Sequence, residues 1–223
     1  MTQDSVEDTK RRLMDAAGEV FSKQGFKAAT VRTICRMARA NVAAVHYHFG
    51  GKEGLYTALL SEAFEAGLRR NPPDMGLPAS APAEARLFAF IHSFLLRMLG
   101  EGRYAWCGKL MAREMHESTQ ALDHMVEHHI MPLAMQLRGI VAEILGPGAS
   151  PDDPQTRLCA MSIAGQCQYV FRSKAIIDRL APDLRFDEAG IRALAEHIMR
   201  FSLCALKAFA DCTEKVDTAA SAS

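Results

Sequence analysis

The chain has 223 residues, of which 49% are hydrophobic and 23% are charged. This composition is typical of a folded globular protein, and the length suits one large domain or a small domain beside a larger one. No run of about 18 uncharged apolar residues occurs, so we expect no membrane-spanning helix and no membrane partner. The polar, acidic start lacks the apolar part of a secretory signal, and the six cysteines include no C-x-x-C pair, so we expect reduced thiols and a cytoplasmic location.

The net charge is zero, but the charges are distributed unevenly along the chain. Residues 9–52 hold nine Lys or Arg against two Asp or Glu, which gives this segment a net charge of +7. The balancing negative charge lies on residues 1–8 and 53–223. A basic segment at one end of a mildly acidic chain is typical of a protein that binds nucleic acid at that end. Chance clustering of surface charge would give the same numbers, so charge alone does not decide the matter.

Two helices are predicted in the first 40 residues. The first begins after Asp8 or Thr9, and its apolar residues recur at helical spacing. It ends at Gly25, with Phe26 folding back on it as in a Schellman motif. Thr30 is the expected N-cap of the second helix, because its hydroxyl oxygen can accept a hydrogen bond from a free backbone N–H group. The apolar side of this second helix consists of Val31, Ile34, Cys35 and Ala38.

A third helix, with Asn41 as its N-cap, is predicted from residue 42 to about residue 48. Val45 and Phe49 share one face and are expected to point inward. Two short helices joined by three residues, the second with small and polar outward residues, have the geometry of a helix–turn–helix that enters the major groove of DNA. The outward residues are Ala43, Ala44, His46 and Tyr47.

The rest of the chain is also predicted to be helical, with no strand. A fourth helix runs from residue 52 or 53 to about 68, and a proline-rich break follows to about residue 82. Pro132 is expected to kink or divide one later helix, and a break is expected at Arg172 and Ser173. Residues 217–223 are of low complexity and are expected to fray. The later helices are expected at 83–99, 104–117, 119–145, 154–180 and 187–210.

These segments resemble a known family. Thr30-Val-Arg-x-Ile, Ala38 and the run His48-Phe-Gly-x-Lys-Glu-x-Leu-Tyr are similar to the N-terminal domain of TetR-type transcriptional regulators. Leu110-Met-Ala-Arg-Glu-Met and Leu158-Cys-Ala-Met-Ser-Ile resemble the C-terminal domain of the CecR-like branch of that family. The resemblance implies an all-α fold. In it, an N-terminal three-helix helix–turn–helix DNA-binding domain (1–70) is joined by the fourth helix to a larger helical ligand-binding and dimerisation domain (83–212).

The resemblance also implies a function and a set of residues. The chain would be a homodimeric repressor, not an enzyme and without a cofactor, that binds a palindromic double-stranded DNA operator and responds to an unknown small-molecule effector. Thr30, Tyr47, His48 and Lys52 would contact phosphates, and the outer face of the third helix would contact bases. Arg39 stands where many members have a turn glycine. The full set of DNA-binding candidates is Thr30, Arg32, Val42, Ala43, Ala44, His46, Tyr47, His48 and Lys52.

The C-terminal part is rich in methionine and aromatic residues at helical spacing. Ordinary core filling explains most of them, and a plastic apolar pocket for a small molecule is the alternative. The last two long helices, 154–180 and 187–210, are expected to form the dimer interface as a four-helix bundle. The candidate ligand-binding residues are Trp106, Met115, His116, Gln166 and Tyr169.

Two other interpretations remain open at this stage. His124-x-x-Glu127-His128 spells the H-x-x-E-H pattern of one class of zinc protease, with two histidines at the spacing that lets both ligate one metal ion. That class also needs a third, acidic ligand on a separate helix, and no partner of this kind stands out, so the pattern does not establish a metal site. The second interpretation is a helical scaffold with no nucleic-acid partner.

Overall fold

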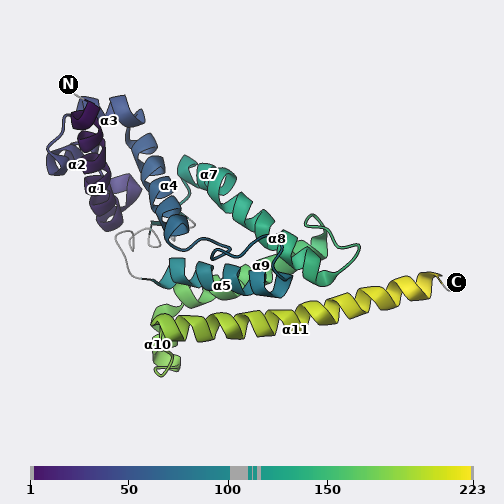
Figure 1. The fold of residues 1–223 in the computed structure, drawn as a ribbon. Coiled ribbons are helices and arrows are strands. Elements are labelled where there is room, and N and C mark those ends of the chain that lie inside the picture. Colours follow the sequence, from purple (N-terminus) through teal and green to yellow (C-terminus); the bar gives the residue numbers. More distant parts are fainter. Residues whose placement is uncertain (1–2, 101–109, 112, 115–116, 222–223) are drawn as a thin grey trace. The chain divides into compact units, whose positions relative to one another are not determined.

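The computed structural model describes residues 3–100, 110–111, 113–114 and 117–221, and it describes side chains from residue 6 to residue 211 within these ranges. Every regular element in the described part of the chain is helical, as predicted (Figure 1). The chain divides into two compact units. The head unit comprises Met1–Gly67 and Glu101–Ile130, and the body unit comprises Leu68–Gly100 and Met131–Ser223.

The head unit begins with the four helices expected from the sequence. These are α1 (Gln3–Ala28), α2 (Val31–Ala38), α3 (Val42–Phe49) and α4 (Lys52–Arg70), whose last residues belong to the body unit. The helix of α1 starts earlier than predicted but is interrupted at Gly25, as predicted, where φ is 78° and ψ is 173°. Backbone of this kind is open almost only to glycine. Phe26 then folds back, and its ring centroid lies 6.1 Å from that of Phe21.

Local capping explains why two helices of only eight residues each form in the head unit. The Thr30 side chain accepts a hydrogen bond from the backbone N–H of Thr33, and the Asn41 side chain accepts one from that of Ala43. Each cap satisfies a backbone donor that has no partner within its helix. Both predicted caps are therefore confirmed.

The core of the head unit is formed in part by residues far along the chain. Phe21, Phe26 and Tyr56 form an aromatic cluster, with Tyr56 4.9 Å from each of the two phenylalanine ring centroids. Met125, from α7 (Gln120–Met125), is fully buried in this core, and so is Leu110. The contribution of the segment around α7 to the head unit was not anticipated by the predicted division at residues 70 and 83.

The body unit is a bundle of long helices. In it α11 packs along α5, and both contact α8 and α9, around a single apolar core (Figure 1). The helices are α5 (Ala83–Leu99), α8 (Met131–Leu145), α9 (Pro154–Arg172), α10 (Lys174–Leu180) and α11 (Glu188–Ser221). In the part of the chain that the structure describes, no helix is long and apolar enough to cross a membrane.

Two of the predicted breaks are confirmed, and one end differs. The helix that contains Pro132 is interrupted just before it by a π-helical turn, η1 (Val126–Ile130). Proline lacks an N–H group and its ring clashes with the carbonyl four residues earlier, and a π-turn accommodates both effects. The next helix ends at Arg172, before Ser173. The final helix continues to Ser221, past the predicted end, through an alanine-rich sequence that favours helix.

The body unit holds the residue that follows α4 with a pair of side chains from α5. The backbone carbonyl of Asn71 accepts hydrogen bonds from Ser93 Oγ (2.7 Å) and Arg97 Nη1 (2.9 Å). Burial lowers the pKa of Arg97 to about 10, and the buried thiol of Cys167 lies near enough to be coupled to it electrostatically. The C-terminal end of α4 is thus fixed to α5.

Candidate nucleic-acid interface

The exposed face of α3 is close to the predicted one. Val45 is fully buried and Phe49 packs against the core, while Ala43 and His46 are exposed. Tyr47 is 80% exposed, the largest value among the exposed large hydrophobic residues of the described chain. The exposed residues are small or polar, apart from Tyr47 and the partly exposed Val42 at the start of the helix.

Ala44 lies only partly on the outward face that was predicted for it. Ala44 was assigned to the outward face, but it is half-buried and packs against the core of the head unit. It lies one residue before the fully buried Val45 on the helix, at the border between the inward and outward faces. The outward face of α3 is therefore narrower than expected.

Three arginines lie on α2 and at its C-terminal cap, just before α3 in the chain. Arg32, Arg36 and Arg39 follow at i, i+4 and i+7 and are all exposed. None of the three forms an ion pair within the described residues, whereas Lys23 pairs with Glu19 and Lys27 with Glu117. We call these three residues the arginine row. Only Arg32 was among the predicted DNA-binding residues, although the spacing of the other two was visible in the sequence.

The predicted phosphate-contacting residues differ in their surroundings. Thr30 is exposed at the start of α2 while its hydroxyl caps that helix. The Tyr47 and His48 rings lie edge to face at 4.9 Å at the end of α3. Lys52 is half-buried instead, with its Nζ 4.5 Å from the centroid of the Phe26 ring and 3.3 Å from the carbonyl oxygen of Lys27. Lys52 therefore already has partners within the head unit.

The turn between α2 and α3 is a Schellman motif with an arginine in the position that glycine usually occupies. Arg39 has φ 51° and ψ 46°, in the left-handed region. Its N–H donates to the Arg36 carbonyl (3.4 Å), and the N–H of Ala40 donates to the Cys35 carbonyl (2.9 Å). The left-handed conformation is unfavourable for any residue that has a side chain. Other contacts must therefore stabilise it at Arg39.

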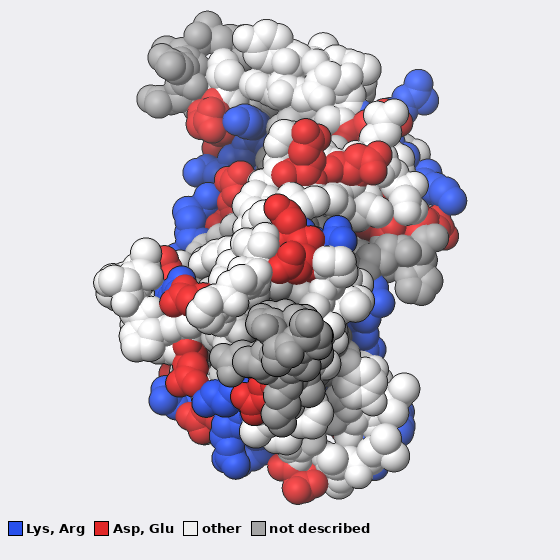
Figure 2. All heavy atoms as spheres, turned by 90° about the vertical axis from the view of Figure 1, so that its right-hand side faces the viewer, with Lys and Arg blue, Asp and Glu red and all other residues white. Residues whose placement is uncertain are grey.

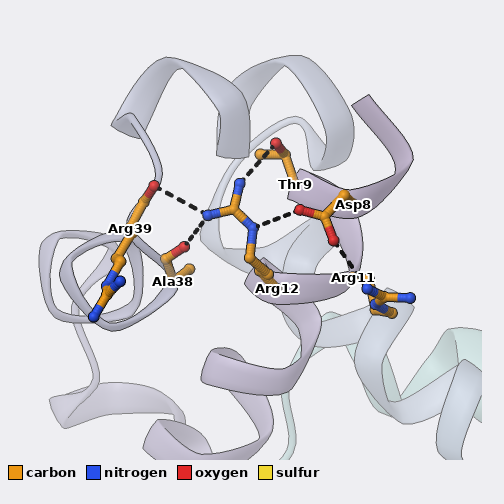
Figure 3. Close-up of polar contacts among 6 residues, drawn as sticks. All are labelled: Asp8, Thr9, Arg11, Arg12, Ala38 and Arg39. Carbon is orange, nitrogen blue, oxygen red and sulfur yellow. Dashed lines mark hydrogen bonds and ion pairs between the residues drawn. The ribbon is translucent and has the colours of Figure 1, made fainter. Parts of the chain in front are cut away.

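Arg12 of α1 contacts this turn directly (Figure 3). Its Nη1 donates to the backbone carbonyls of Ala38 (2.9 Å) and Arg39 (3.3 Å). Its Nη2 donates to Thr9 Oγ1 (3.1 Å), and its Nε lies 3.1 Å from a carboxylate oxygen of Asp8. Arg12 is therefore used inside the head unit, although it was counted in the basic charge of residues 9–52.

Surface charge is mixed elsewhere on the molecule. On the face drawn in Figure 2, Lys and Arg side chains lie interspersed with Asp and Glu. Several charged residues of the body unit form ion pairs within one helix, such as Lys174 with Asp178 (2.8 Å) and Arg192 with Glu196 (3.1 Å). Paired surface charges of this kind attract a polyanion weakly, so the arginine row, which has no ion pair with the residues that the structure describes, is the more important basic feature.

The predicted ligand-binding residues do not all fall in the described part of the chain. Trp106, Met115 and His116 lie outside the described residues. Gln166 and Tyr169 line an open groove of about 400 Å³ between α9 and α11, together with Leu194, His197 and Ile198. Gln166 Nε2 also donates to Ser202 Oγ across the two helices (3.3 Å).

The histidines of the H-x-x-E-H pattern lie together without forming a complete metal site. The ring centroids of His124 and His128 are 4.4 Å apart, and that of His129 is 6.0 Å from His124. His129 also packs against Phe64 of α4. Among the described residues, no group of three potential ligands is placed to hold a metal ion.

Comparisons with known proteins agree with this arrangement. Residues 13–59 match the model for bacterial regulatory proteins of the tetR family. Residues 83–206, more than half of the chain, match the model for the C-terminal domain of the HTH-type transcriptional dual regulator CecR. The chain belongs to the TetR family. Its C-terminal domain is of the CecR type.

Individual curated relatives match only part of this TetR-family chain. The HTH-type transcriptional regulator UidR of Escherichia coli K12 is 32% identical over 68 residues, which cover 30% of this chain and 35% of that protein. The HTH-type transcriptional repressor NicS of Pseudomonas putida is 31% identical over 91 residues, covering 40% and 42%. The match thus spans less than half the length of either relative.

A solved structure shares the fold of this TetR-family chain over nearly its whole length. A transcriptional regulator from Pseudomonas aeruginosa PAO1 superposes with a TM-score of 0.66 at 20% identity, over 90% of this chain and 93% of that one. The predicted all-α fold, with an N-terminal helix–turn–helix and a larger helical C-terminal part, is therefore confirmed.

Proposed function

We propose that this TetR-family protein is a homodimeric repressor that binds a palindromic DNA operator and leaves it when a small molecule binds. The observation that carries the DNA-binding proposal is the exposed, small-residue face of α3, preceded in the chain by the exposed arginine row, which forms no ion pair within the described residues. The proposal that the protein represses transcription is supported by its partial similarity to NicS, which is named a repressor.

In this proposal α3 lies in the major groove of the operator. Ala43 lets the helix approach closely and can contact a thymine methyl group, and His46 can bond a base edge. Tyr47 and His48 reach the sugar-phosphate backbone from the end of α3, and Thr30 from the start of α2. Arg36 and Arg39 extend the contact along a phosphate strand, while Lys52 has a smaller part because it is already bonded within the head unit.

The dimer is proposed to form through α9 and α11. Both helices expose large apolar side chains in this single chain, which burial in an interface would remove from water. The groove between them has apolar walls that a partner helix can fill. The exposed residues are Leu158, Met161 and Tyr169 of α9, and Phe201 and Phe209 of α11.

The effector is proposed to act through α4, which begins in the head unit and ends in the body unit. Ligand-induced movement of α5 would reach α4 through the Asn71 carbonyl, because Ser93 and Arg97 hold that group. A coupling free energy of about 1–3 kcal/mol is typical of such systems and is enough to release an operator. We propose that residues 1–70 bind DNA and that residues 83–212 bind the ligand and dimerise, with the segment around α7 in the second range completing the head core.

The proposal is tested by letting the purified full-length chain select duplexes from a randomised library. We expect an enriched palindrome with half-sites about 34 Å apart. His46→Ala should change the preferred half-site, whereas Arg36→Gln should weaken binding to every duplex and lower the salt slope by about one.

A charge-matched control for Arg36→Gln is Arg185→Gln, which removes an exposed arginine from the body unit. It should leave both affinity and salt slope unchanged. Selection of no duplex at low salt would refute DNA binding, and an unchanged preference in His46→Ala would remove α3 as the reading helix.

A further inference from the structure

The turn between α2 and α3 places a residue with a side chain where the backbone conformation favours glycine. Arg39 has a positive φ of 51°, and its N–H and that of Ala40 complete the Schellman motif. The backbone carbonyls of Ala38 and Arg39, which come before and after this φ angle, accept neither of these two bonds. In a helix–turn–helix this turn sets the angle between the two helices, so its conformation determines how α3 is presented.

One side chain from outside the motif bonds both of these carbonyls. Arg12 Nη1 is 2.9 Å from the Ala38 oxygen and 3.3 Å from the Arg39 oxygen. A single charged donor that bridges two successive carbonyls restrains the peptide unit between them, because rotation at Arg39 would break one of the two bonds. Charge-assisted hydrogen bonds are also stronger than neutral ones.

Arg12 is itself held on its other side. Thr9 Oγ1 accepts from Nη2, and Asp8 lies within ion-pair distance of Nε (Figure 3). Asp8 also accepts from Arg11 at 2.9 Å. These contacts orient the guanidinium group toward the turn, so that α1 provides a rigid support for it.

We propose that Arg12 is a positioning residue for DNA reading, which locks the left-handed Arg39 turn and thereby fixes α3 for the operator. This inference rests on the proposed DNA-binding function and adds a residue that does not itself touch DNA. It also explains how the chain retains an arginine at position 39, where glycine would need no such support. Arg39 then presents its exposed side chain at the end of the arginine row.

The test compares three variants on two probes. The probes are the duplex that the wild-type chain selects and a scrambled duplex of equal length. Arg12→Met should weaken binding to the selected duplex by about tenfold, ~1.4 kcal/mol, with a much smaller change on the scrambled one. Arg12→Lys keeps the charge but cannot bridge in the same planar geometry, so it should lose most of the same factor.

Arg11→Met is the matched control. Arg11 is the preceding residue on α1, carries the same charge and bonds the same Asp8, but it does not reach the turn. It should change the affinity for both probes equally and slightly. If Arg12→Met behaves like Arg11→Met on both probes, or if Arg12→Lys is fully active, Arg12 acts only through its charge and the inference is wrong.

The double variant separates positioning from general stability. Glycine adopts the left-handed conformation without support from Arg12. In the Arg39→Gly background, Arg12→Met should therefore reduce the affinity for the selected duplex much less than it does in the wild-type background. All measurements are made at a temperature where circular dichroism shows each variant folded. If Arg12→Met weakens binding by the same factor in the Arg39→Gly background as in the wild-type background, the inference is overturned.

A measurement without DNA keeps the inference distinct from the proposed function. In the free protein, Arg12→Met should lower the Tm more in the wild-type background than in the Arg39→Gly background. If the wild-type chain selects no duplex, the proposed function fails, and with it the role of Arg12 in reading DNA. The Tm comparison would still decide whether Arg12 locks the turn, and equal Tm losses in the two backgrounds would refute the lock.

Discussion

At the scale of single residues, His92 in α5 is a buried titratable group that should respond to mild acid. It is 7% exposed, its ring stacks on Phe88 at 5.4 Å, and its Nε2 has no hydrogen-bond partner within the described residues. Burial lowers its pKa, with a further lowering by Arg192, and Glu188 and Glu196 raise it by less. The folded protein therefore favours the neutral imidazole.

This environment predicts a loss of stability in mild acid. Because the pKa of His92 is lower in the folded chain than its ordinary 6.5, the unfolded chain binds the proton more readily. The contribution of neutral His92 to stability is complete above the pKa of the unfolded chain. It declines as the pH falls from that value toward the lower pKa of His92 in the folded chain. Melting curves between about pH 7.5 and 5.5 should show a smaller Tm decrease in His92→Gln than in the wild type.

The exposed His46 of α3, which lies outside the proposed dimer face, provides the control for this measurement, since the melting curves are recorded without DNA. His46→Gln should reproduce the Tm decrease of the wild type over the same range. If His92→Gln and the wild type lose the same number of degrees, the neutral form of His92 does not contribute to stability.

At the scale of elements, the sequence predicted best where the determinant is local. Thr30 and Asn41 cap their helices by bonds to residues two or three positions away, so the short helices α2 and α3 could be placed within a residue or two. The roles of Arg12 and Ala44 could not be predicted in this way, because each depends on which face of another helix packs against it. The assignment of α7 to the head unit has the same cause: apolar periodicity shows that Met125 is buried, but not in which core.

The packing of α7 gives a testable difference between two methionines. Met125 is fully buried in the head core, and its sulfur lies 3.8 Å from Ser61 Oγ of α4. Met125→Ala leaves a cavity there and should lower the free energy of unfolding by about 2–5 kcal/mol. Met135→Ala, at a 37% exposed site on α8, should change it by less than about 0.5 kcal/mol. Urea denaturation measures both, and similar small losses would show that α7 is not part of the head core.

At the scale of the whole molecule, the exposed apolar side chains of α9 and α11 predict the oligomeric state. Tyr169 is 57% and Phe201 63% exposed in the single chain. In the proposed dimer both become buried, so an arginine at either position would be an unpaired charge in an apolar interface. Phe201→Arg should raise the Kd of dimerisation by well over tenfold in sedimentation equilibrium.

Leu184→Arg provides the comparison for the dimer measurement. Leu184 is 51% exposed, in the segment between α10 and α11, and lies outside the proposed contact helices. It should leave the dimer intact. A Phe201→Arg protein that sediments as the wild type does would exclude this face from the interface.

The head unit is discontinuous in sequence, since Glu101–Ile130 completes a core begun by Met1–Gly67. During synthesis, the core of the head unit must therefore wait for Leu110 and Met125 to leave the ribosome before it can be completed. Engineering faces the same constraint. A chimera that joins this head to another regulator within α4 would separate the helix–turn–helix from part of its own core, whereas transplanting α7 with it would keep that core together.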